Sequence, residues 1–259
     1  MEQNPYETSR LLSEYLLFHY GSAEEILPAF AGSSHAPREA LGFPARVVRE
    51  CVPTLAVTSG RALDVGCAVG RASFELARQF PEVVGIDFSR NFIAAAEELR
   101  ATGRIGYTRT DEGLLTTPLV ATVPREIARR RVRFEVGDAC KLDAARLGQF
   151  DMVLAINLID RLPSPGKFLA ALPALVQPGG GRLILASPYT WLEEYTPKSE
   201  WLGGFVDASG RRVQTLDSLR ATLAPDFDLI ETRDLPFLIR EHARKFQWSV
   251  SQASIWQRR

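Results

Sequence analysis

The chain is poor in cysteine, has no excess of charge of either sign and contains no long hydrophobic run. Its three cysteines, at positions 51, 67 and 140, lack the close spacing of metal-ligand motifs, and their odd number fits a reducing compartment better than a disulfide framework. The 31 basic residues balance 31 acidic residues, so no overall positive field is available to hold nucleic acid or an anionic membrane. We therefore expect neither a bound metal nor a nucleic-acid partner.

Signals for export and for membrane insertion are also missing. No apolar stretch approaches the length of a membrane span, and the first residues lack the charged and apolar regions of a signal peptide. We therefore expect a cytoplasmic protein without a membrane partner. With 259 residues, of which 46% are hydrophobic, the chain can bury one large core, and we expect a single domain over residues 1–259.

The stretch from Arg61 to Arg71 reads as a strand, a glycine loop and the start of a helix. The short apolar run 62–65 is typical of a buried parallel strand, and apolar residues recur at helical spacing over 73–80. Residues 66–70 then form the turn between strand and helix, where ligands bind in α/β proteins. Glycines let the backbone approach a ligand, and the helix start favours a negative group such as a carboxylate. Asp64, at the strand end, can accept a hydrogen bond from a bound ammonium.

A second strand, at residues 83–87, ends in another acid. Asp87 follows the glycine loop by about 20 residues, which is the position where a ribose diol is usually held. A NAD-type fingerprint would require glycine where Ala68 and Arg71 stand. The pattern therefore favours a nucleoside over a dinucleotide.

Apolar or alternating runs predict five further strands after residue 87. The last two are expected to pair antiparallel, and the others are expected to extend the parallel sheet. These strands cover residues 132–136, 150–162, 182–187, 227–237 and 248–256. Helices are predicted at 45–52, from Ser89 to Gly103, at 167–176 and at 216–223.

Two connections leave alternatives open. Residues 104–124 form a longer connection than usual, rich in glycine, threonine and proline, and read as either a functional flap or a flexible insertion. The charged residues at 240–245 read as a solvated connection or as a site that recognises a carboxylate.

Polar residues follow several of the predicted strands. Asp138 comes after the strand 132–136, either as a turn or helix-cap residue or as an acceptor from the amino group of a purine. Asn157, Asp160 and Arg161 stand just past the apolar part of the next strand, over the same crevice. The aromatic and acidic loop 188–194 follows another strand and serves either surface packing or a substrate wall.

An amphipathic helix is predicted from Thr8 to Tyr20, ahead of the sheet. It either covers the sheet edge or acts as a lid. In a lid, Tyr6, Tyr15, His19 and Tyr20 would close over a cofactor, although a lone histidine is more often packed than catalytic.

The glycine loop, Asp87, Asp138 and the turn Pro178-Gly-Gly occur in the order found in class I S-adenosylmethionine-dependent methyltransferases, which the chain resembles over residues 55 to 259. The resemblance implies an α/β, Rossmann-like fold with a seven-stranded, mostly parallel sheet, an antiparallel last strand and helices on both faces. It also implies S-adenosylmethionine as cofactor and S-adenosylhomocysteine as product. Residues 1–54 would form an N-terminal helical cover on the core 55–259. The expected cofactor contacts are Tyr15, Asp64, Gly66, Cys67, Gly70, Asp87, Phe88, Asp138, Ala139 and Asn157.

A narrower resemblance, to the ovothiol-pathway methyltransferases, spans nearly the whole chain. That family methylates a ring nitrogen of 4-mercaptohistidine (5-thiohistidine), so the resemblance implies this acceptor and favours the lid role of the first helix. No sulfoxide-synthase domain is present, so a separate protein of the pathway is the implied partner. The matching segments are Tyr6 to Thr8, Ser13 to Gly21, Asp64 to Arg71, Asn157 to Arg161, Ser187 to Glu194, Trp201 to Phe205 and Arg244 to Gln247.

The implied reaction displaces a methyl group from a sulfonium by a ring nitrogen that is already nucleophilic. The protein then mainly positions the reactants, excludes water and holds the other ring N–H. Asn157, Asp160 and Tyr189 are the expected catalytic residues. The substrate's carboxylate needs a cation and its ammonium needs an acid. The expected substrate contacts are Arg161, Trp191, Glu193 and Arg240.

Two other functions stay open on the sequence alone. One is methylation of another small molecule or of nucleic acid, which the neutral charge disfavours. The other is a nucleoside-binding module of the same fold without catalysis. The polar and aromatic residues at 157–161 and 187–194 argue against such a module, which would not need them.

Overall fold

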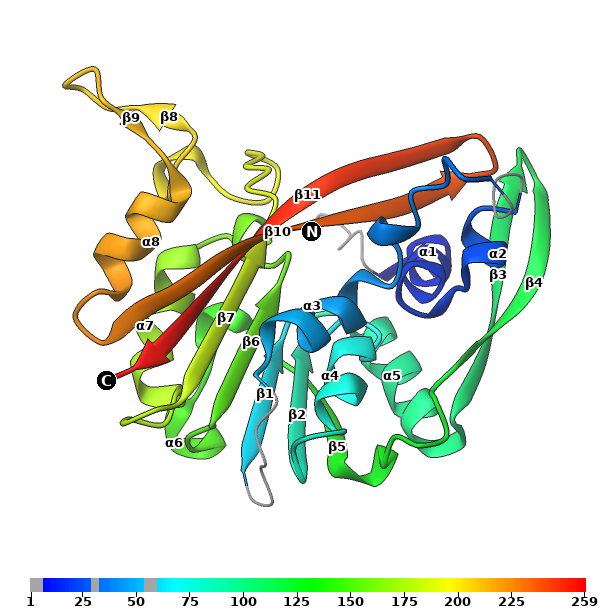
Figure 1. Ribbon diagram of the computed structural model, residues 1–259, viewed down its shortest axis with the longest axis horizontal. Coiled ribbons are helices and arrows are strands. Elements are labelled where there is room, and N and C mark those ends of the chain that lie inside the picture. The colour runs from blue at the N-terminus through cyan, green and yellow to red at the C-terminus, as the bar shows by residue number, and fades with distance from the viewer. Residues whose placement is uncertain (1–6, 29–32, 54–59) are drawn as a thin grey trace.

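The computed structural model describes residues 7–28, 33–53 and 60–259, which build an α/β fold around one seven-stranded sheet (Figure 1). The strand order is β10-β11-β7-β6-β1-β2-β5. The five strands from β7 to β5 are parallel, and β11 runs antiparallel to both β7 and β10. This confirms the predicted Rossmann-like class. The sheet strands are β1 Arg61–Val65, β2 Glu82–Asp87, β5 Val132–Val136, β6 Met152–Ile156, β7 Arg182–Ser187, β10 Phe227–His242 and β11 Lys245–Arg258.

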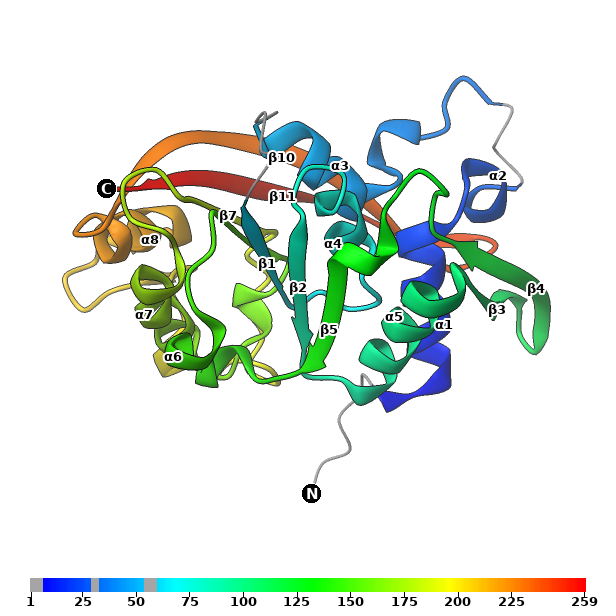
Figure 2. The same cartoon turned by 90° about the horizontal axis from the view of Figure 1, so that it is seen from below.

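Helices cover both faces of the sheet (Figure 2). On one face α3, α4 and α5 pack together with α1, and on the other face lie α6, α7 and α8. The helices are α1 Ser9–Tyr20, α2 Ala23–Ile26, α3 Phe43–Cys51, α4 Arg71–Leu76, α5 Arg90–Thr102, α6 Ala144–Leu147, α7 Pro165–Leu175 and α8 Thr215–Leu223. Short 3₁₀ turns occupy Arg38–Ala40, Arg129–Arg131, Ala139–Lys141, Ile159–Arg161 and Lys198–Glu200. In the described ranges no helix combines the length and apolar composition that crossing a membrane requires.

The central strands form where the sequence has short, continuous apolar runs. β1, β6 and β7 are buried over nearly their whole length, because helices cover them on both sides. Two apolar cores result, one on each face of the sheet. The sheet's rigidity fixes the ends of these strands, which is where the polar residues of interest lie.

The helix caps predicted from the sequence are also present in the structure. The hydroxyl of Thr8 accepts from Leu11 N and begins α1 at the predicted residue. Ser89 caps α5 in the same way, and Gly103 ends it with a φ of 82°, in the left-handed region that suits glycine.

Two segments differ from the expected connections. Residues 104–124 mostly form an ordered two-stranded hairpin, β3 Arg104–Glu112 and β4 Leu115–Thr122. Residues 240–245 are the turn region of a second long hairpin, since β10 and β11 extend well beyond the predicted strands. The small pair β8 Phe205–Val206 and β9 Arg212–Val213 completes the strands.

The two long hairpins meet at their tips beside α1 (Figure 1). Ala243 N donates to the carbonyl oxygen of Asp111 at 3.0 Å, which links the turn of β10–β11 to β3. α1 packs against β10 and β3, so the two hairpins hold the N-terminal helix from its outer side.

Candidate functional site

The glycine loop joins the end of β1 to the start of α4 with three residues of positive φ. Gly66 has a φ of 75° and Gly70 a φ of 81°, and Ala68 between them has a φ of 47°. Ala68 therefore adopts a left-handed conformation that glycine adopts more readily than alanine. Its N–H donates to Asp87 Oδ2 at 2.8 Å, so the loop is tied to the end of β2.

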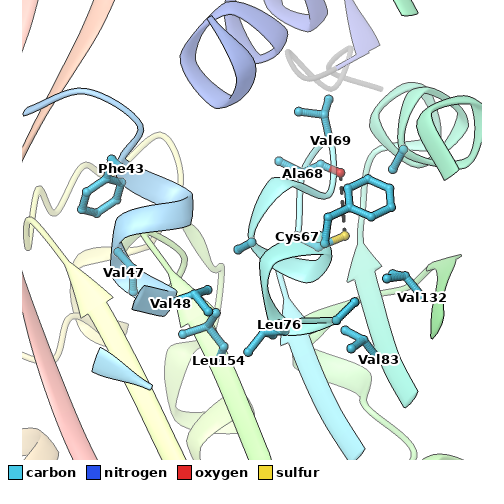
Figure 3. Packing of buried hydrophobic residues seen from close by; sticks show 14 of the residues in the cluster. Phe43, Val47, Val48, Cys67, Ala68, Val69, Leu76, Val83, Val132 and Leu154 are labelled. Carbon is cyan, nitrogen blue, oxygen red and sulfur yellow. Dashed lines mark hydrogen bonds between the residues drawn. The ribbon is translucent and has the colours of Figure 1, made fainter. Parts of the chain in front are cut away.

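The apolar side chains of the loop also pack into the core and hold the loop in place. Cys67 and Val69 are buried in the core on the α4 side, among the residues drawn in Figure 3. Cys67 N donates to Ile86 O at 3.0 Å, Gly70 N donates to Cys67 O at 2.9 Å, and the Cys67 thiol lies 3.7 Å from Ala68 O. Burial raises the pKa of this thiol well above its usual range, so it stays protonated. These bonds show that Cys67 helps to hold the loop, and its expected contact with the cofactor stays a prediction.

Asp64 is 1% exposed beneath the loop and accepts a hydrogen bond from Ser73 Oγ at 2.6 Å. Burial is the main cause that raises the pKa of Asp64 to about 7. A neighbouring cation would favour the ionised carboxylate, so this group suits an ammonium ligand.

Asp87 and Phe88 end the next strand. The Asp87 carboxylate accepts from Ala68 N and, through Oδ1, from Ser89 N at 2.9 Å, and burial raises its pKa. The ring of Phe88 is 65% exposed beside it. An aromatic ring left this open next to a buried strand end offers a flat apolar surface on which a purine could stack.

Asp138 follows β5 and acts as a cap. Its Oδ1 accepts from Cys140 N at 2.8 Å, and Lys141 Nζ lies 3.3 Å from its Oδ2. The cap alternative for Asp138 is therefore realised, with the carboxylate still half-buried at the sheet edge. Ala139, the next predicted contact, is buried.

Asp160 is the centre of a hydrogen-bonded cluster beyond β6. Although only 1% exposed, it accepts from Ser187 Oγ at 2.8 Å, from Thr190 N at 3.1 Å and from Arg161 Nη1 at 3.0 Å. A carboxylate with this many donors holds the loop after β7 in place. Asp160 therefore supports the loop that carries Thr190, and its expected catalytic role stays a prediction.

Arg161 is used within the same cluster. Besides Asp160 it donates to Thr190 O at 2.7 Å, and its guanidinium lies 4.9 Å from the ring centre of Tyr195. These bonds all leave from Nη1, and no acceptor for Nε or Nη2 is seen among the described residues, so the expected contact of Arg161 with a substrate carboxylate stays a prediction.

Tyr189 and Asn157 stand above the cluster in strained conformations. Their φ values are 54° and 51°, and with Ala68 they are the non-glycine residues with positive φ in the part of the chain that the structure describes. Such strain gathers at functional sites, where the surrounding structure maintains it. All three lie at the carboxyl ends of β1, β6 and β7, which marks this edge of the sheet as the site.

The side chains of both residues reach β11. Tyr189 Oη donates to Gln252 Oε1 at 3.2 Å, and burial raises the pKa of Tyr189 to about 12, so the phenol is neutral. Asn157 Oδ1 accepts from Ser251 Oγ. Sequence reasoning missed Ser251 and Gln252, because nothing in their local pattern shows that β11 passes beside the ends of β6 and β7.

α1 lies against the glycine loop and α5. Tyr20 Oη donates to Val69 O in the glycine loop at 2.8 Å, and the ring of Tyr15 packs on Phe92 of α5 at 4.6 Å between centroids. Just before α1, Glu7 accepts from Arg90 N at 2.9 Å and from Asn91 N at 3.3 Å. Tyr6 lies outside the described residues. These contacts are those that a cover over the loop and the start of α5 would make.

His19 is 8% exposed, and burial lowers its pKa to about 3, so it is neutral and does not serve as a base near neutral pH.

Three of the predicted substrate residues do not join the cluster. Trp191 is buried, donates through Nε1 to Thr215 Oγ1 at 2.9 Å and stacks on Trp201, which is the packing alternative. Glu193 is exposed on the following turn. Arg240 lies on the distal part of β10 and is bonded to Asp111 Oδ1 at 2.9 Å and to Ile26 O at 2.9 Å. The long hairpin therefore carries Arg240 to the outer side of α1, beside β3, and its expected contact with the substrate stays an untested prediction.

The model of a family described as a methyltransferase domain matches residues 35–248 of the chain. Among solved structures, the chain resembles the PH0226 protein of Pyrococcus horikoshii, with a TM-score of 0.51, 19% identity and coverage of 84% of this chain and 92% of that one. It also resembles a SAM-dependent methyltransferase of Methanosarcina mazei, with a TM-score of 0.50, 20% identity and coverage of 82% and 96%. At these identities the two structures support the fold alone.

Curated relatives match a shorter part of the chain. The ubiquinone biosynthesis O-methyltransferase of Burkholderia lata is 29% identical over 120 residues, which are 46% of this chain and 41% of that protein. The enzyme of the same name from Methylococcus capsulatus is 28% identical over 120 residues, which are 46% and 40%. The match thus spans about two fifths of the length of these relatives.

Proposed function

Since the chain belongs to the methyltransferase-domain family and is an S-adenosylmethionine-dependent methyltransferase, we propose that its methyl acceptor is an imidazole ring nitrogen of 4-mercaptohistidine, which becomes ovothiol. The family match favours catalysis over the non-catalytic binding module. The finer proposal depends on how the segments of the narrower resemblance are arranged.

The observation that carries the proposal is that four of these segments, far apart in the sequence, are bonded in two pairs near the carboxyl ends of β1, β6 and β7. Tyr20, in the segment Ser13 to Gly21, donates to Val69 O in the segment Asp64 to Arg71. Asp160, in the segment Asn157 to Arg161, accepts from Ser187 and Thr190 in the segment Ser187 to Glu194. A constellation held together in this way supports one shared site, although other methyl acceptors could use the same frame.

S-adenosylmethionine would supply the methyl group on a sulfonium, which is a strong electrophile. The residues of the cofactor half fit its parts. Asp64 is a buried carboxyl suited to the ammonium, the Asp87 carboxylate can accept from the ribose hydroxyls, and Phe88 offers an open ring to the adenine. We further propose that the backbone of Gly66 and Gly70 lines the methionine part, and that Asp138 and Ala139 border the base.

At the acceptor half, Tyr189 and Asn157 are the residues we propose to contact the ring. The Tyr189 hydroxyl gives its hydrogen to Gln252, so its oxygen lone pairs can accept the N–H of the non-attacking ring nitrogen. Asn157 uses its carbonyl oxygen on Ser251, so its amide NH₂ is the group it can offer. Asp160 and Arg161 act through the loop that they hold, as positioning residues.

The N-terminal helix would then exclude water from the reacting centre. We propose that residues 1–54 act as a cover on a core of 55–259, with Tyr15 and Tyr20 on its inner side. The boundary at residue 54 lies outside the described residues. Exposed Glu193 remains a candidate for the substrate ammonium. A sulfoxide synthase acting earlier in the pathway, in the cytoplasm, would supply the thiol substrate.

The competing function is O-methylation of a phenolic acceptor, to which the names of the curated relatives point. Incubating the chain with methyl-labelled cofactor and 4-mercaptohistidine, histidine or catechol separates the two. We expect label in an N-methylated thiol product, little in histidine and none in catechol. Asp87→Ala serves as the control for enzyme-dependent transfer. Preferential labelling of catechol would overturn the proposed acceptor and leave the methyltransferase assignment intact.

A further inference from the structure

A cavity lies between α1 and the two long hairpins, and its lining contains none of the residues at the ends of β1, β6 and β7. Its volume is about 250 Å³, which suits a small ion or group better than a nucleoside. It is lined by Ser9, Arg10, Ser13, Glu14, Leu17, Thr108, Arg109, Thr110, Arg240 and Glu241.

This cavity is separated from the crevice by α1 itself. Ser13 and Leu17 line the cavity, whereas Tyr15 and His19 lie two positions further along and so point to roughly the opposite side of the helix. Tyr15 packs on Phe92 next to the cofactor half of the crevice. The cavity is therefore a different site from the one where methyl transfer is proposed.

Two guanidinium groups in the cavity wall share a single carboxylate. Arg109 Nε and Arg240 Nη2 both donate to Asp111 Oδ1, at 2.8 Å and 2.9 Å. Their remaining described partners are neutral oxygens: Arg109 donates to Glu25 O and to Thr117 Oγ1, and Arg240 donates to Ile26 O and Thr110 O. Among the residues that the structure describes, Asp111 balances one of these two positive charges, and the other has no counterion bonded to it.

The acidic residues of the wall do not supply that counterion, because each is already paired. Glu14 accepts from Arg10 at 2.9 Å. Glu241 accepts from Lys245 Nζ at 2.6 Å and from Gln247. The imbalance therefore stays with Arg109 and Arg240.

Arg240 is the deeper of the two and is incompletely bonded. Its side chain is 1% exposed, and no described residue accepts from its Nε–H. Burial and the charge of Arg109 lower the pKa of Arg240, which is the direction expected when a cation lacks compensation. A buried cation of this kind is costly unless a second anion joins it.

We infer that this cavity binds a small oxyanion, a phosphate or a carboxylate group, between Arg109 and Arg240. Guanidinium forks suit both anions, and the hydroxyls of Ser13 and Thr108 offer further donors. Because the cavity wall is made by α1, β3 and β10, the anion would fasten the outer side of the helix whose end bonds to the glycine loop.

The test is calorimetric titration of the full chain with sodium phosphate and, separately, with sodium acetate, each against sodium chloride at equal ionic strength. We expect saturable heat from at least one of the two oxyanions and a matching rise in Tm. Saturation by phosphate alone assigns a phosphate ligand, and saturation by acetate alone assigns a carboxylate. If neither saturates, or if chloride gives the same Tm rise, the inference is wrong.

Two variants locate the site. Arg109→Gln leaves Arg240 and Asp111 balanced, so we expect binding to weaken at least tenfold. The matched control Arg220→Gln removes a side chain of α8 that is 54% exposed, paired with Asp217 and outside the cavity lining, and should change affinity by less than about twofold. Ser13→Glu places a tethered carboxylate in the cavity and should raise Tm without added anion and abolish the response to it. Wild-type affinity in Arg109→Gln would overturn the assignment.

Discussion

At the ends of β1 and β6 the crevice holds two aspartates that are equally buried and differently used. Asp64 and Asp160 are each 1% exposed. Asp64 accepts from the hydroxyl and the backbone of one residue, Ser73, and burial raises its pKa to about 7. Asp160 accepts from a hydroxyl, a backbone N–H and a guanidinium. A buried carboxyl with few donors is ready to receive a cationic ligand, whereas one with a full set of donors supports the structure around it.

The largest effect is expected where the supporting carboxylate is removed. Asp160→Ala removes the carboxylate that accepts from Ser187 Oγ and Thr190 N and leaves Arg161, which still donates to Thr190 O, without its ion pair. We expect a loss of about 3 kcal/mol, at the lower end for buried pairs because Arg161 is partly exposed. Urea unfolding followed by circular dichroism measures it. Asp160→Asn, which keeps the shape and one acceptor, is the matched control and should lose less. An unchanged urea midpoint in Asp160→Ala would contradict the supporting role.

The second prediction is that changing Asp64 lowers cofactor affinity and leaves the stability of the fold unchanged. Asp64→Asn keeps a hydrogen-bond acceptor for Ser73 and removes a charge that burial disfavours, so the fold should not lose stability at pH 8. Cofactor affinity should fall by about 1.5–3 kcal/mol, or ten- to a hundredfold, because a charge-assisted bond to the ammonium is lost. Calorimetry with S-adenosylhomocysteine measures this. Destabilisation without loss of affinity would make Asp64 a second supporting residue and remove the contrast with Asp160.

The sequence predicts features that depend on local patterns better than features that depend on contacts between distant residues. The apolar runs of β1, β2, β5, β6 and β7 predict a parallel sheet, and a parallel sheet gathers its strand ends along one edge. The location of Asp64, Asp87 and Asn157 could therefore be predicted.

The bonding partners of these residues could not be predicted in the same way. Asp160 meets Ser187 and Thr190, 27 and 30 positions away, and Asn157 meets Ser251 across 94 positions. The hairpin at 104–124 was missed for a related reason: β3 and β4 have little continuous apolar sequence, and their tip is held by contacts such as Ala243 N to Asp111 O. Tertiary contacts outweigh local propensity in both cases.

A third prediction uses the pKa of Asp64 to derive how fold stability and cofactor affinity change with pH. The folded pKa, about 7, lies above the ordinary value of 3.8, so its contribution to stability is fully present below pH 3.8 and is lost as pH rises through 7. An ammonium ligand requires the ionised carboxylate, so affinity for S-adenosylhomocysteine should rise about tenfold between pH 6 and pH 8, with uptake of the ligand releasing a proton.

Titrations in buffers of different ionisation enthalpy measure that proton. Asp64→Asn is the control and should bind weakly at both pH values with no proton released. A flat pH profile in the wild type would place the cofactor's ammonium elsewhere.

The smallest effect is expected from removing one oxygen atom, the Tyr189 hydroxyl, from the proposed acceptor site. A thiolate is ordinarily a better nucleophile toward a methyl sulfonium than a ring nitrogen, so selective N-methylation requires the ring of 4-mercaptohistidine to be held in one orientation. We propose that the Tyr189 oxygen, fixed by its bond to Gln252 at 3.2 Å, accepts the non-attacking N–H. Tyr189→Phe removes that acceptor, which is worth about 0.5–1.5 kcal/mol, so turnover should fall roughly two- to tenfold.

The proportion of products distinguishes orientation from a general loss of activity. A ring that can rotate presents its sulfur, so Tyr189→Phe should release some S-methylated product, which mass fragmentation separates from the N-methylated one. Gln252→Ala leaves the phenol in place without its partner and should show a weaker form of the same change. Because a merely slower enzyme would keep its selectivity, exclusive N-methylation in both variants would remove Tyr189 from the orientation of the acceptor ring.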